Sequence, residues 1–237
     1  MAPSTPASPP LPFERERDAA RSREAILEAA EQLFAERGYD ATSLSDVGQA
    51  AGVSRGTPGY FFGSKADLYR AVLEHCFAEA TATIRIGRDR ALASQESPDV
   101  ILAGIVRDYF DFLAERPSYV KLMERNALGD GPPTDAELVR PIGQEALAAF
   151  MAELGVGRQR AREAAHLLLS LLSLCWFPVV HAGTYVTAVG LDPASRRFAE
   201  ERRQHVIALI LHGAAGVLGG KTTPRRERNA VSSTSKQ

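Results

Sequence analysis

The sequence predicts an all-α protein in which a three-helix head at the N-terminus precedes a larger helical domain. Apolar residues recur at intervals of three and four positions over most of the 237-residue chain, which is the spacing of amphipathic helices. Short Gly and Pro segments separate these stretches, and the alternating patterns of β-strands are nearly absent. These observations favour a helical bundle over a fold that contains a sheet.

The first two helices of the head have clear boundary signals. A helix is predicted over residues 18–36, and Gly38 follows it at the position where a positive φ commonly ends a helix. Thr42 or Ser43 caps a second helix, because Ser43 has an acidic residue three positions later in the spacing of a capping box. This second helix is predicted to end near Ala50.

The next two helices follow a tight turn. Residues 51–53 contain the turn, and Ser54 is predicted to cap a third helix that runs to about Phe61. Ser64 caps a long fourth helix that extends toward Arg90. Further helices are predicted over residues 98–115, 117–128, 134–154, 158–177 and 193–218.

The two ends of the chain have a different composition. Residues 1–17 are rich in Pro, Ser and Ala at their start and lack the basic and apolar regions of a signal peptide, so they are interpreted as a disordered leader. Residues 221–237 are rich in Ser, Thr and Arg, and a disordered basic tail is predicted there.

Composition and charge restrict the class of protein. Hydrophobic residues make up 45% of the chain and charged residues 24%, which is typical of a globular protein that folds without metal or disulfide. The net charge is −1, so any nucleic-acid surface has to come from local arrangement. Cys76 and Cys175 lie in apolar helical patterns and are interpreted as core residues, which suits the reducing cytoplasm.

One long apolar stretch has to be weighed as a membrane span. Residues 164–191 contain no Asp, Glu, Lys or Arg, and their length would suffice to cross a bilayer. His166, Pro178, His181 and Gly183 interrupt the stretch, and no second span accompanies it. A buried helix of a soluble bundle is therefore the favoured interpretation, without a membrane partner.

Positions 44–61 have the pattern of a helix-turn-helix. This motif requires small residues where two short helices touch, a Gly in the turn and apolar residues beneath. The inward positions are Leu44, Val47 and Val53, with Gly48 at the close approach and Gly52 in the turn. In a DNA-binding motif of this kind, the third helix is expected to present four outward residues to DNA: Ser54, Arg55, Thr57 and Tyr60. Arg55 is the first candidate for a base contact, because its guanidinium can donate two hydrogen bonds to guanine.

Residues 38–65 resemble the TetR family of bacterial transcriptional regulators. The matching residues are Gly38-Tyr39, Thr42-Ser43, Val47, Ala51-Gly52-Val53-Ser54, Gly56-Thr57 and Phe62-Gly63-Ser64-Lys65, and Glu115-Arg116-Pro117 resembles a helix break of the family. The resemblance implies a DNA-binding head at residues 18–64. It also implies a ligand-binding and dimerisation domain at residues 65–220.

The resemblance also implies roles for single residues. Thr42, Ser43 and Lys65 resemble phosphate anchors, and the outward residues of the third helix resemble the groove readers. The sequence departs from the family pattern in two places. Gly48 stands where Ala is usual, and Thr57-Pro58-Gly59-Tyr60 stands where the family usually has Thr-Leu-Tyr and a variable residue. Gly59 thereby replaces an aromatic residue that contacts a phosphate in the family.

The resemblance implies that the larger domain holds a small effector among its middle helices and forms a homodimer. Aromatic and Met residues of the middle helices suit an apolar or aromatic effector, although the same residues also suit plain core packing. The candidates for the pocket are Phe110, Met123, Phe150, Trp176 and Phe177. Residues 164–177 and 198–218 are apolar enough to need burial against a second subunit, which predicts a palindromic DNA operator.

The predicted function is that of a repressor that a small effector releases from its operator. Neither metal-ligand spacing nor a catalytic pattern is evident, so no enzyme activity, cofactor or metal is expected. The alternative is a helical ligand-binding or interaction protein whose head no longer reads DNA. Pro58-Gly59 within the third helix makes this alternative conceivable.

Overall fold

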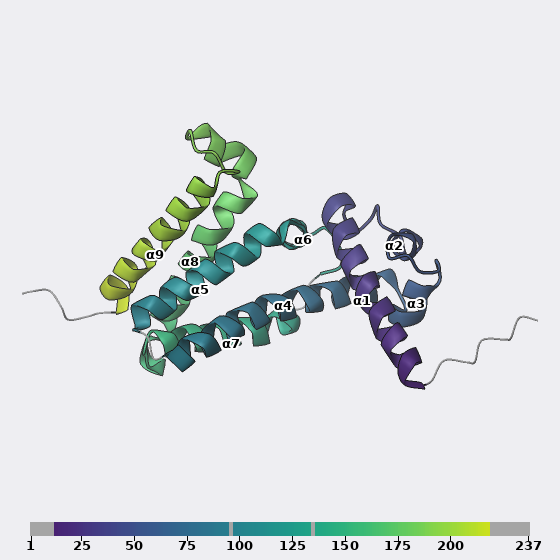
Figure 1. The fold of residues 1–237 in the computed structure, drawn as a ribbon, viewed down its shortest axis with the longest axis horizontal. Coiled ribbons are helices and arrows are strands. Elements are labelled where there is room, and N and C mark those ends of the chain that lie inside the picture. Colours follow the sequence, from purple (N-terminus) through teal and green to yellow (C-terminus); the bar gives the residue numbers. More distant parts are fainter. Residues whose placement is uncertain (1–11, 95–96, 134–135, 219–237) are drawn as a thin grey trace, which may run out of the picture.

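All regular structure in the described residues is helical. The computed structural model describes residues 12–94, 97–133 and 136–218 (Figure 1). In chain order the elements are α1 Pro12–Arg37, α2 Leu44–Ala50, α3 Thr57–Phe62, α4 Lys65–Ser94, α5 Pro98–Glu115, α6 Pro117–Ala127, α7 Ala136–Glu153, η1 Arg158–Arg160, α8 Ala161–Val180, η2 Ala182–Val186 and α9 Arg196–Leu218. The predicted all-α class is confirmed.

The start of α1 differs from the prediction. The helix begins at Pro12, so residues 12–17, which the sequence analysis assigned to a leader, are helical. A proline in the first turn costs no hydrogen bond, because the first N–H groups of a helix have no partner within it. Residues 1–11 and the predicted tail at 221–237 lie outside the described residues.

The C-terminal helices also have different bounds. A short 3-10 turn, η1, precedes α8, and α8 continues through Pro178, which is buried, to Val180. The π-helical segment η2 follows, which the sequence analysis did not predict. Helix α9 begins at Arg196, where the Ser195 hydroxyl accepts a hydrogen bond from the backbone N–H of Phe198 at 3.1 Å.

The molecule has a small head joined to a longer body. Helices α1, α2 and α3 form the head, and α4 runs from the head into the body, where it contacts α5 and α7 (Figure 1). Helices α8 and α9 pack against each other at the end of the body away from the head. Within the described ranges, the segment Arg158–Val180 is long and apolar enough to span a membrane by length and composition.

Helix α1 links head and body through its apolar face. Ile26 and Ala30 are fully buried, and Leu27 and Phe34 are at most 2% exposed. These side chains belong to one continuous core that also contains Val47 of the head and residues of α4 to α9. Burial of each such side chain stabilises the fold by about 1.5–3 kcal/mol, so the head is firmly attached to the body.

A buried ion cluster fastens the middle of α1 to the body. Glu31 is 3% exposed and accepts hydrogen bonds from Arg116 Nη2 at 2.9 Å and from Ser118 Oγ at 2.5 Å. The same Arg116 nitrogen lies 2.6 Å from a carboxylate oxygen of Glu79 on α4. Hydrogen bonding with Glu79 raises the pKa of Arg116, which keeps the guanidinium charged. A buried carboxylate on α1 thus has its countercharge at the α5–α6 break.

Replacing this countercharge should destabilise the whole protein. We expect Arg116→Met to lower the free energy of unfolding by about 3 kcal/mol, because the buried Glu31 carboxylate loses its cationic partner. Urea unfolding followed by circular dichroism measures the change. Arg70→Met, which breaks an exposed pair with Glu74, is the control and should have almost no effect. Equal unfolding midpoints for the two variants would contradict the assigned role.

Candidate nucleic-acid interface

The first helix of the motif, α2, begins with a complete capping box. The backbone N–H of Asp46 donates to Ser43 Oγ at 3.1 Å, and the backbone N–H of Ser43 donates to Asp46 Oδ2 at 3.1 Å. The hydrogen bond from the Ser43 side chain lowers the pKa of Asp46. Ser64 and Asp67 form the same reciprocal pair at the start of α4. Both predicted caps are confirmed.

A close approach between backbones determines the angle between α2 and α3. A Cβ atom at Gly48 would lie 2.9 Å from the carbonyl oxygen of Ser54 and 3.1 Å from Cα of Arg55. Gly52 has a φ of +69°, which lets the chain reverse, and the N–H of Val53 then donates to the Gly48 carbonyl at 3.0 Å. The glycine at position 48 therefore has a packing reason, since any larger residue would push α3 away.

The reading helix α3 begins later than predicted. The sequence favoured Ser54 as its N-cap, whereas the helix begins at Thr57, after Gly56, which provides no side-chain cap. Pro58 lies in the first turn, where its lack of an N–H costs no helical hydrogen bond. Ser54 remains in the turn, with its Oγ 2.6 Å from Thr57 Oγ1. The two hydroxyls therefore form one pair at the tip of the motif.

The outward surface of the motif combines these hydroxyls with a cation and an aromatic ring. Ser54 and Arg55 are exposed, Thr57 is half-buried, and Tyr60 is 86% exposed. The ring of Tyr60 packs edge-on against Phe61, with their centroids 5.4 Å apart. The structure brings these four predicted reading residues together on the turn and the exposed side of α3.

Two residues expected as phosphate anchors are engaged within the protein. Thr42 is 2% exposed, and its hydroxyl donates to the Gly38 carbonyl at 2.8 Å. Lys65 Nζ donates to the Tyr39 carbonyl at 2.9 Å and lies 4.2 Å from the centre of the Tyr39 ring. The side chain of Thr42 is therefore unavailable to DNA, and Lys65 holds the loop before α2. The tertiary contacts that bury these groups are not visible in the motif itself.

One contact of the head was missed by the sequence analysis. The guanidinium of Arg23 on α1 lies over the Phe62 ring at the end of α3, 5.1 Å from its centre. Such cation–π contacts hold a side chain in place while its charge stays in water. No local signal could have paired residues this far apart in the chain.

Comparison with known proteins identifies the motif. Residues 26–72 match the family described as bacterial regulatory proteins, tetR family. The HTH-type transcriptional repressor NicS from Pseudomonas putida is 26% identical over 208 residues, which cover 84% of this chain and 95% of that protein. This chain belongs to the TetR family. As a TetR-family protein it is a DNA-binding transcriptional regulator and not an enzyme.

Two further proteins are similar to this chain over most of its length. The HTH-type transcriptional repressor KstR2 from Mycolicibacterium smegmatis is 26% identical over 224 residues, which cover 93% of this chain and 99% of that protein. A crystal structure of a tetR-family transcriptional regulator from Streptomyces coelicolor has the same fold, with a TM-score of 0.60, 21% identity and 83% coverage of each chain. The TetR likeness in fold therefore includes the body as well as the head.

Gly59, which departs from the TetR pattern in α3, has space for a larger side chain. A Cβ atom at Gly59 would meet only Leu44 Cδ1, at 3.9 Å, which is ordinary van der Waals contact. Packing therefore does not demand a glycine at position 59, in contrast to Gly48. The exposed Tyr60 beside it offers an aromatic side chain on the same short helix.

The body contains a small apolar cavity. It has a volume of about 30 Å³ and lies between α5, α7 and α8. Its lining residues are Ile105, Tyr109, Ala146, Ala149, Phe150, Leu168, Leu171 and Leu172. Of the predicted pocket residues, Phe150 lines this cavity.

The other predicted pocket residues lie elsewhere. Phe110 is 4% exposed within the common core, and Met123 packs against that core. The indole N–H of Trp176 donates to the Glu124 carboxylate. Phe177 is 49% exposed on α8, so its expected place in a pocket is not observed. Helical spacing in α8 could not distinguish its inward face from its outward face, because both faces are apolar.

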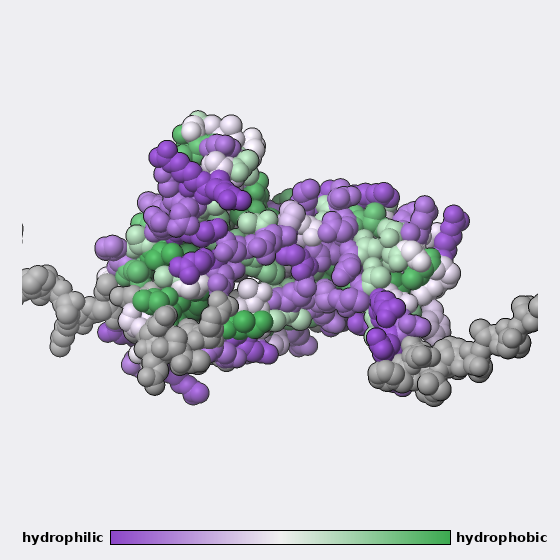
Figure 2. Space-filling model, in the orientation of Figure 1, coloured by the Kyte–Doolittle hydropathy of each residue, from purple (hydrophilic) through white to green (hydrophobic). Residues whose placement is uncertain are grey.

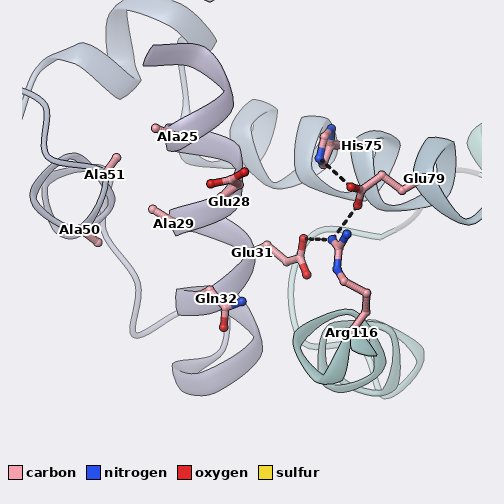
Figure 3. A pocket seen from close by; sticks show the side chains of 10 residues that line it. All are labelled: Ala25, Glu28, Ala29, Glu31, Gln32, Ala50, Ala51, His75, Glu79 and Arg116. Atoms are coloured by element: carbon pink, nitrogen blue, oxygen red, sulfur yellow. Dashed lines mark hydrogen bonds and ion pairs between the residues drawn. The ribbon is translucent and has the colours of Figure 1, made fainter. Parts of the chain in front are cut away.

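A second, polar pocket lies at the joint of head and body. It has a volume of about 460 Å³ and is lined by Ala residues and polar side chains of α1, α2, α4 and Arg116 (Figure 3). Its charged groups bind one another: Arg116 pairs with Glu31 and Glu79, and His75 lies 3.7 Å from Glu79. Among the described residues, no group of three His, Cys, Asp or Glu side chains could hold a metal ion.

The close approach at Gly48 makes a testable prediction. Gly48→Ala should lower the free energy of unfolding by about 1 kcal/mol or more, because the added methyl meets backbone atoms rather than a flexible side chain. Gly104→Ala in α5 is the matched control: its Cβ meets nothing within 4 Å, so it should stabilise the helix by about 0.5–1 kcal/mol. Urea unfolding of both variants measures the difference. Stabilisation by both substitutions would show that α2 and α3 are not closely packed.

Proposed function

We propose that this protein is a TetR-family repressor that binds a palindromic DNA operator as a homodimer and leaves it when a small apolar or aromatic effector binds the body. The observation that carries the proposal is the exposed surface formed by α3 and the turn before it on a buried scaffold. Arg55 and Tyr60 extend from a motif whose caps and close packing hold it rigid. A rigid frame of this kind lets a few side chains read base edges in the major groove.

The proposed DNA contacts divide into two groups. Arg55 is exposed and is proposed to donate two hydrogen bonds to a guanine, and the Ser54–Thr57 pair and Tyr60 are proposed to contact the same groove. Ser43 is exposed at the start of α2, and it is proposed to contact a phosphate by turning its hydroxyl from Asp46 to the DNA. Repression is proposed because the two relatives that align over most of the chain are named repressors. The cytoplasm is the proposed location, since the operator lies there.

The proposed dimer interface is the outer face of α8 and α9. The exposed side chains on this face are His166, Leu169, Ser170, Ser173 and Phe177 of α8 and His205, Ala208, Leu209 and His212 of α9. Figure 2 shows apolar patches among hydrophilic surface at the end of the molecule where these helices lie. These residues are apolar side chains, Ser and His, and an exposed face without Asp, Glu, Lys or Arg is typical of a protein interface. A second copy would bury it and separate the two heads by about one turn of DNA, ~34–36 Å, or a multiple of it.

The proposed effector site is the apolar cavity between α5, α7 and α8. The cavity of about 30 Å³ is too small for a drug-sized ligand, so an effector has to separate these helices when it enters. Both α5 and α7 contact α4, the helix that leads to the head. Effector binding would thereby change the separation of the two heads, provided that the effector prefers the opened state.

The DNA-binding proposal is tested by selection from a random library of duplex DNA. We expect the protein to enrich one palindrome, with an affinity that falls as the salt concentration rises. Arg55→Ala should weaken binding to this sequence about 10- to 100-fold, because a bidentate base contact is lost. Titration of labelled DNA measures both affinities.

The control for this test is Arg140→Ala, which removes the same charge from an exposed position on α7. Its operator affinity should match that of the parent protein. If no sequence is enriched at low or high salt, the head does not read DNA. That result would favour the helical interaction protein that the sequence analysis held as an alternative.

The interface proposal is tested by introducing charge. Leu169→Glu combined with Leu209→Glu should convert the dimer to a monomer, because four carboxylates would face one another across the two-fold axis. Light scattering after size exclusion measures the mass. Ile86→Glu, at a 61% exposed position on α4, is the control and should leave the dimer intact. A dimer that survives the double substitution would place the interface elsewhere.

A further inference from the structure

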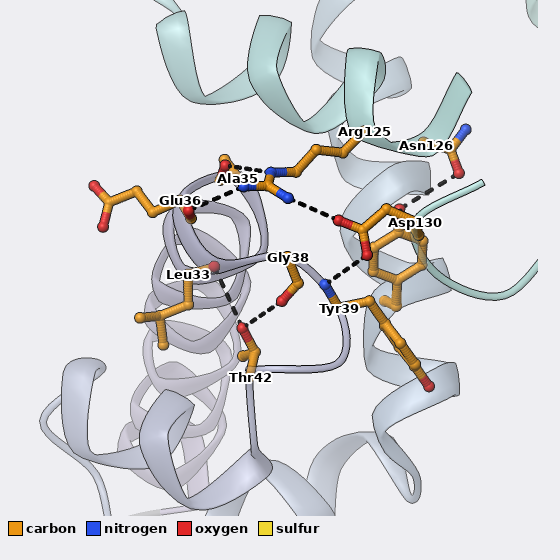
Figure 4. Close-up of polar contacts among 10 residues, drawn as sticks. Leu33, Ala35, Glu36, Gly38, Tyr39, Thr42, Arg125, Asn126 and Asp130 are labelled. Atoms are coloured by element: carbon orange, nitrogen blue, oxygen red, sulfur yellow. Dashed lines mark hydrogen bonds and ion pairs between the residues drawn. The ribbon is translucent and has the colours of Figure 1, made fainter. Parts of the chain in front are cut away.

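Helix α6 of the body holds the C-terminal end of α1 through one arginine. Arg125 Nε donates to the Ala35 carbonyl at 2.9 Å, and Arg125 Nη2 donates to the Glu36 carbonyl at 3.1 Å (Figure 4). Carbonyls in the last turn of a helix have no partner within it, and they carry the negative end of the helix dipole. The guanidinium therefore caps α1 from a residue that is 90 positions away in the chain.

Asp130 extends this contact to the loop that leads into the helix-turn-helix. Asp130 Oδ2 lies 2.9 Å from Arg125 Nη1, and its other carboxylate oxygen accepts a hydrogen bond from the Tyr39 N–H at 3.1 Å (Figure 4). The Tyr69 hydroxyl of α4 donates to the Asp130 carbonyl at 3.0 Å. Burial raises the pKa of Tyr69 to about 12, so the hydroxyl keeps its proton at neutral pH. We call Arg125 and Asp130 the α6 clamp.

Two glycines leave the space that the α6 clamp needs. Gly38 has a φ of +84°, and a Cβ atom there would lie 2.6 Å from Asp130 Oδ2 and 3.0 Å from Arg125 Nη1. A Cβ atom at Gly131 would lie 2.9 Å from the Tyr69 ring. The loop of the head and the loop after α6 are therefore in direct contact.

The contact continues toward the loop before α2 and the start of α4 on one side and toward α8 on the other. The Tyr39 carbonyl accepts from Lys65 at the start of α4, and the adjoining loop residue Thr42 is fixed to the Gly38 carbonyl. On α6, the residue before Arg125 is Glu124, which accepts the Trp176 indole N–H of α8. One turn of α6 thus touches both the frame of the motif and the helix of the proposed dimer interface.

We propose that Arg125 and Asp130 are positioning residues for operator binding, which fix the orientation of the head on the body so that two heads match the spacing of the two half-sites. The proposal rests on the proposed function as a dimeric operator-binding protein. The apolar core supplies most of the cohesion between head and body, but apolar contacts are not directional. Hydrogen bonds with fixed donor and acceptor angles are directional, so the clamp selects one orientation among those that the core permits.

The first test compares whole and half operators. Asp130→Asn and Arg125→Gln should each weaken binding to the selected palindrome at least tenfold, while binding to a duplex with one half-site should change less than twofold. They should also remove the dependence of affinity on half-site spacing when one base pair is inserted at the centre. Damage to the reading surface itself would weaken whole and half operators alike, and that result would overturn the proposal.

The matched control is Asp111→Asn. Asp111 pairs with Arg203 at 2.8 Å across α5 and α9, two helices of the body, with side chains exposed to a similar degree as those of the clamp. This variant should keep both the affinity and the spacing dependence of the parent protein. If Asp111→Asn weakened operator binding as much as Asp130→Asn, the proposal would be overturned, because loss of any ion pair in the body would then have the same effect.

A second measurement tests without DNA whether the α6 clamp fixes the orientation of the head. Nitroxide labels at Gln49→Cys on α2 and Gln144→Cys on α7 report the distance between head and body by pulsed electron resonance, with labelled chains diluted in unlabelled ones. Cys76 and Cys175 are buried, so the label reacts at the introduced sites. The clamp variants should broaden the distance distribution, and Asp111→Asn should not. An unchanged distribution would refute the clamp even if the parent protein selects no operator.

Discussion

Helix α1 is buried on two sides, and the rest of the structure depends on this double burial. One side of the helix covers α2 and α3, and the other packs against α4 and α6. Ile26, Leu27, Ala30 and Phe34 are all within 2% of full burial, so their packing joins the head to the body in one core. The head therefore cannot turn as an independent domain, and any change in its orientation has to involve α1.

Polar contacts along α1 specify its position relative to the body. Glu31 meets Arg116 near the middle of the helix, and the α6 clamp holds its C-terminal end. Because an unpaired buried carboxylate is costly, the first contact strongly favours a single register between α1 and the α5–α6 break. The clamp lies closer to the surface, so it contributes less to stability and more to geometry.

The reading head combines two departures from the TetR pattern that fit each other. Gly48 removes a methyl group at the place where α3 approaches α2, and Pro58 Cδ lies 3.3 Å from where that Cβ would be. A proline in the first turn of α3 is thus accommodated by the glycine opposite it. Gly59 has no such packing reason, and the exposed Tyr60 provides the aromatic surface next to it.

The sequence by itself determined the helices and their order, because these depend on local chemistry. The caps at Ser43 and Ser64, the turn at Gly52 and the bounds of α5 follow from residues a few positions apart. The family and the exposed residues that are proposed to read DNA also follow from such a local pattern.

Only the tertiary structure decided which polar groups remain free and which faces are inside. The burial of Thr42, the engagement of Lys65 and the outward direction of Phe177 depend on packing between elements distant in sequence. Arg125 is an ordinary basic residue of an amphipathic helix until α1 places two helix-terminal carbonyls within its reach. Local periodicity predicts that a helix has a face, but the partners of that face are fixed only when the whole chain packs.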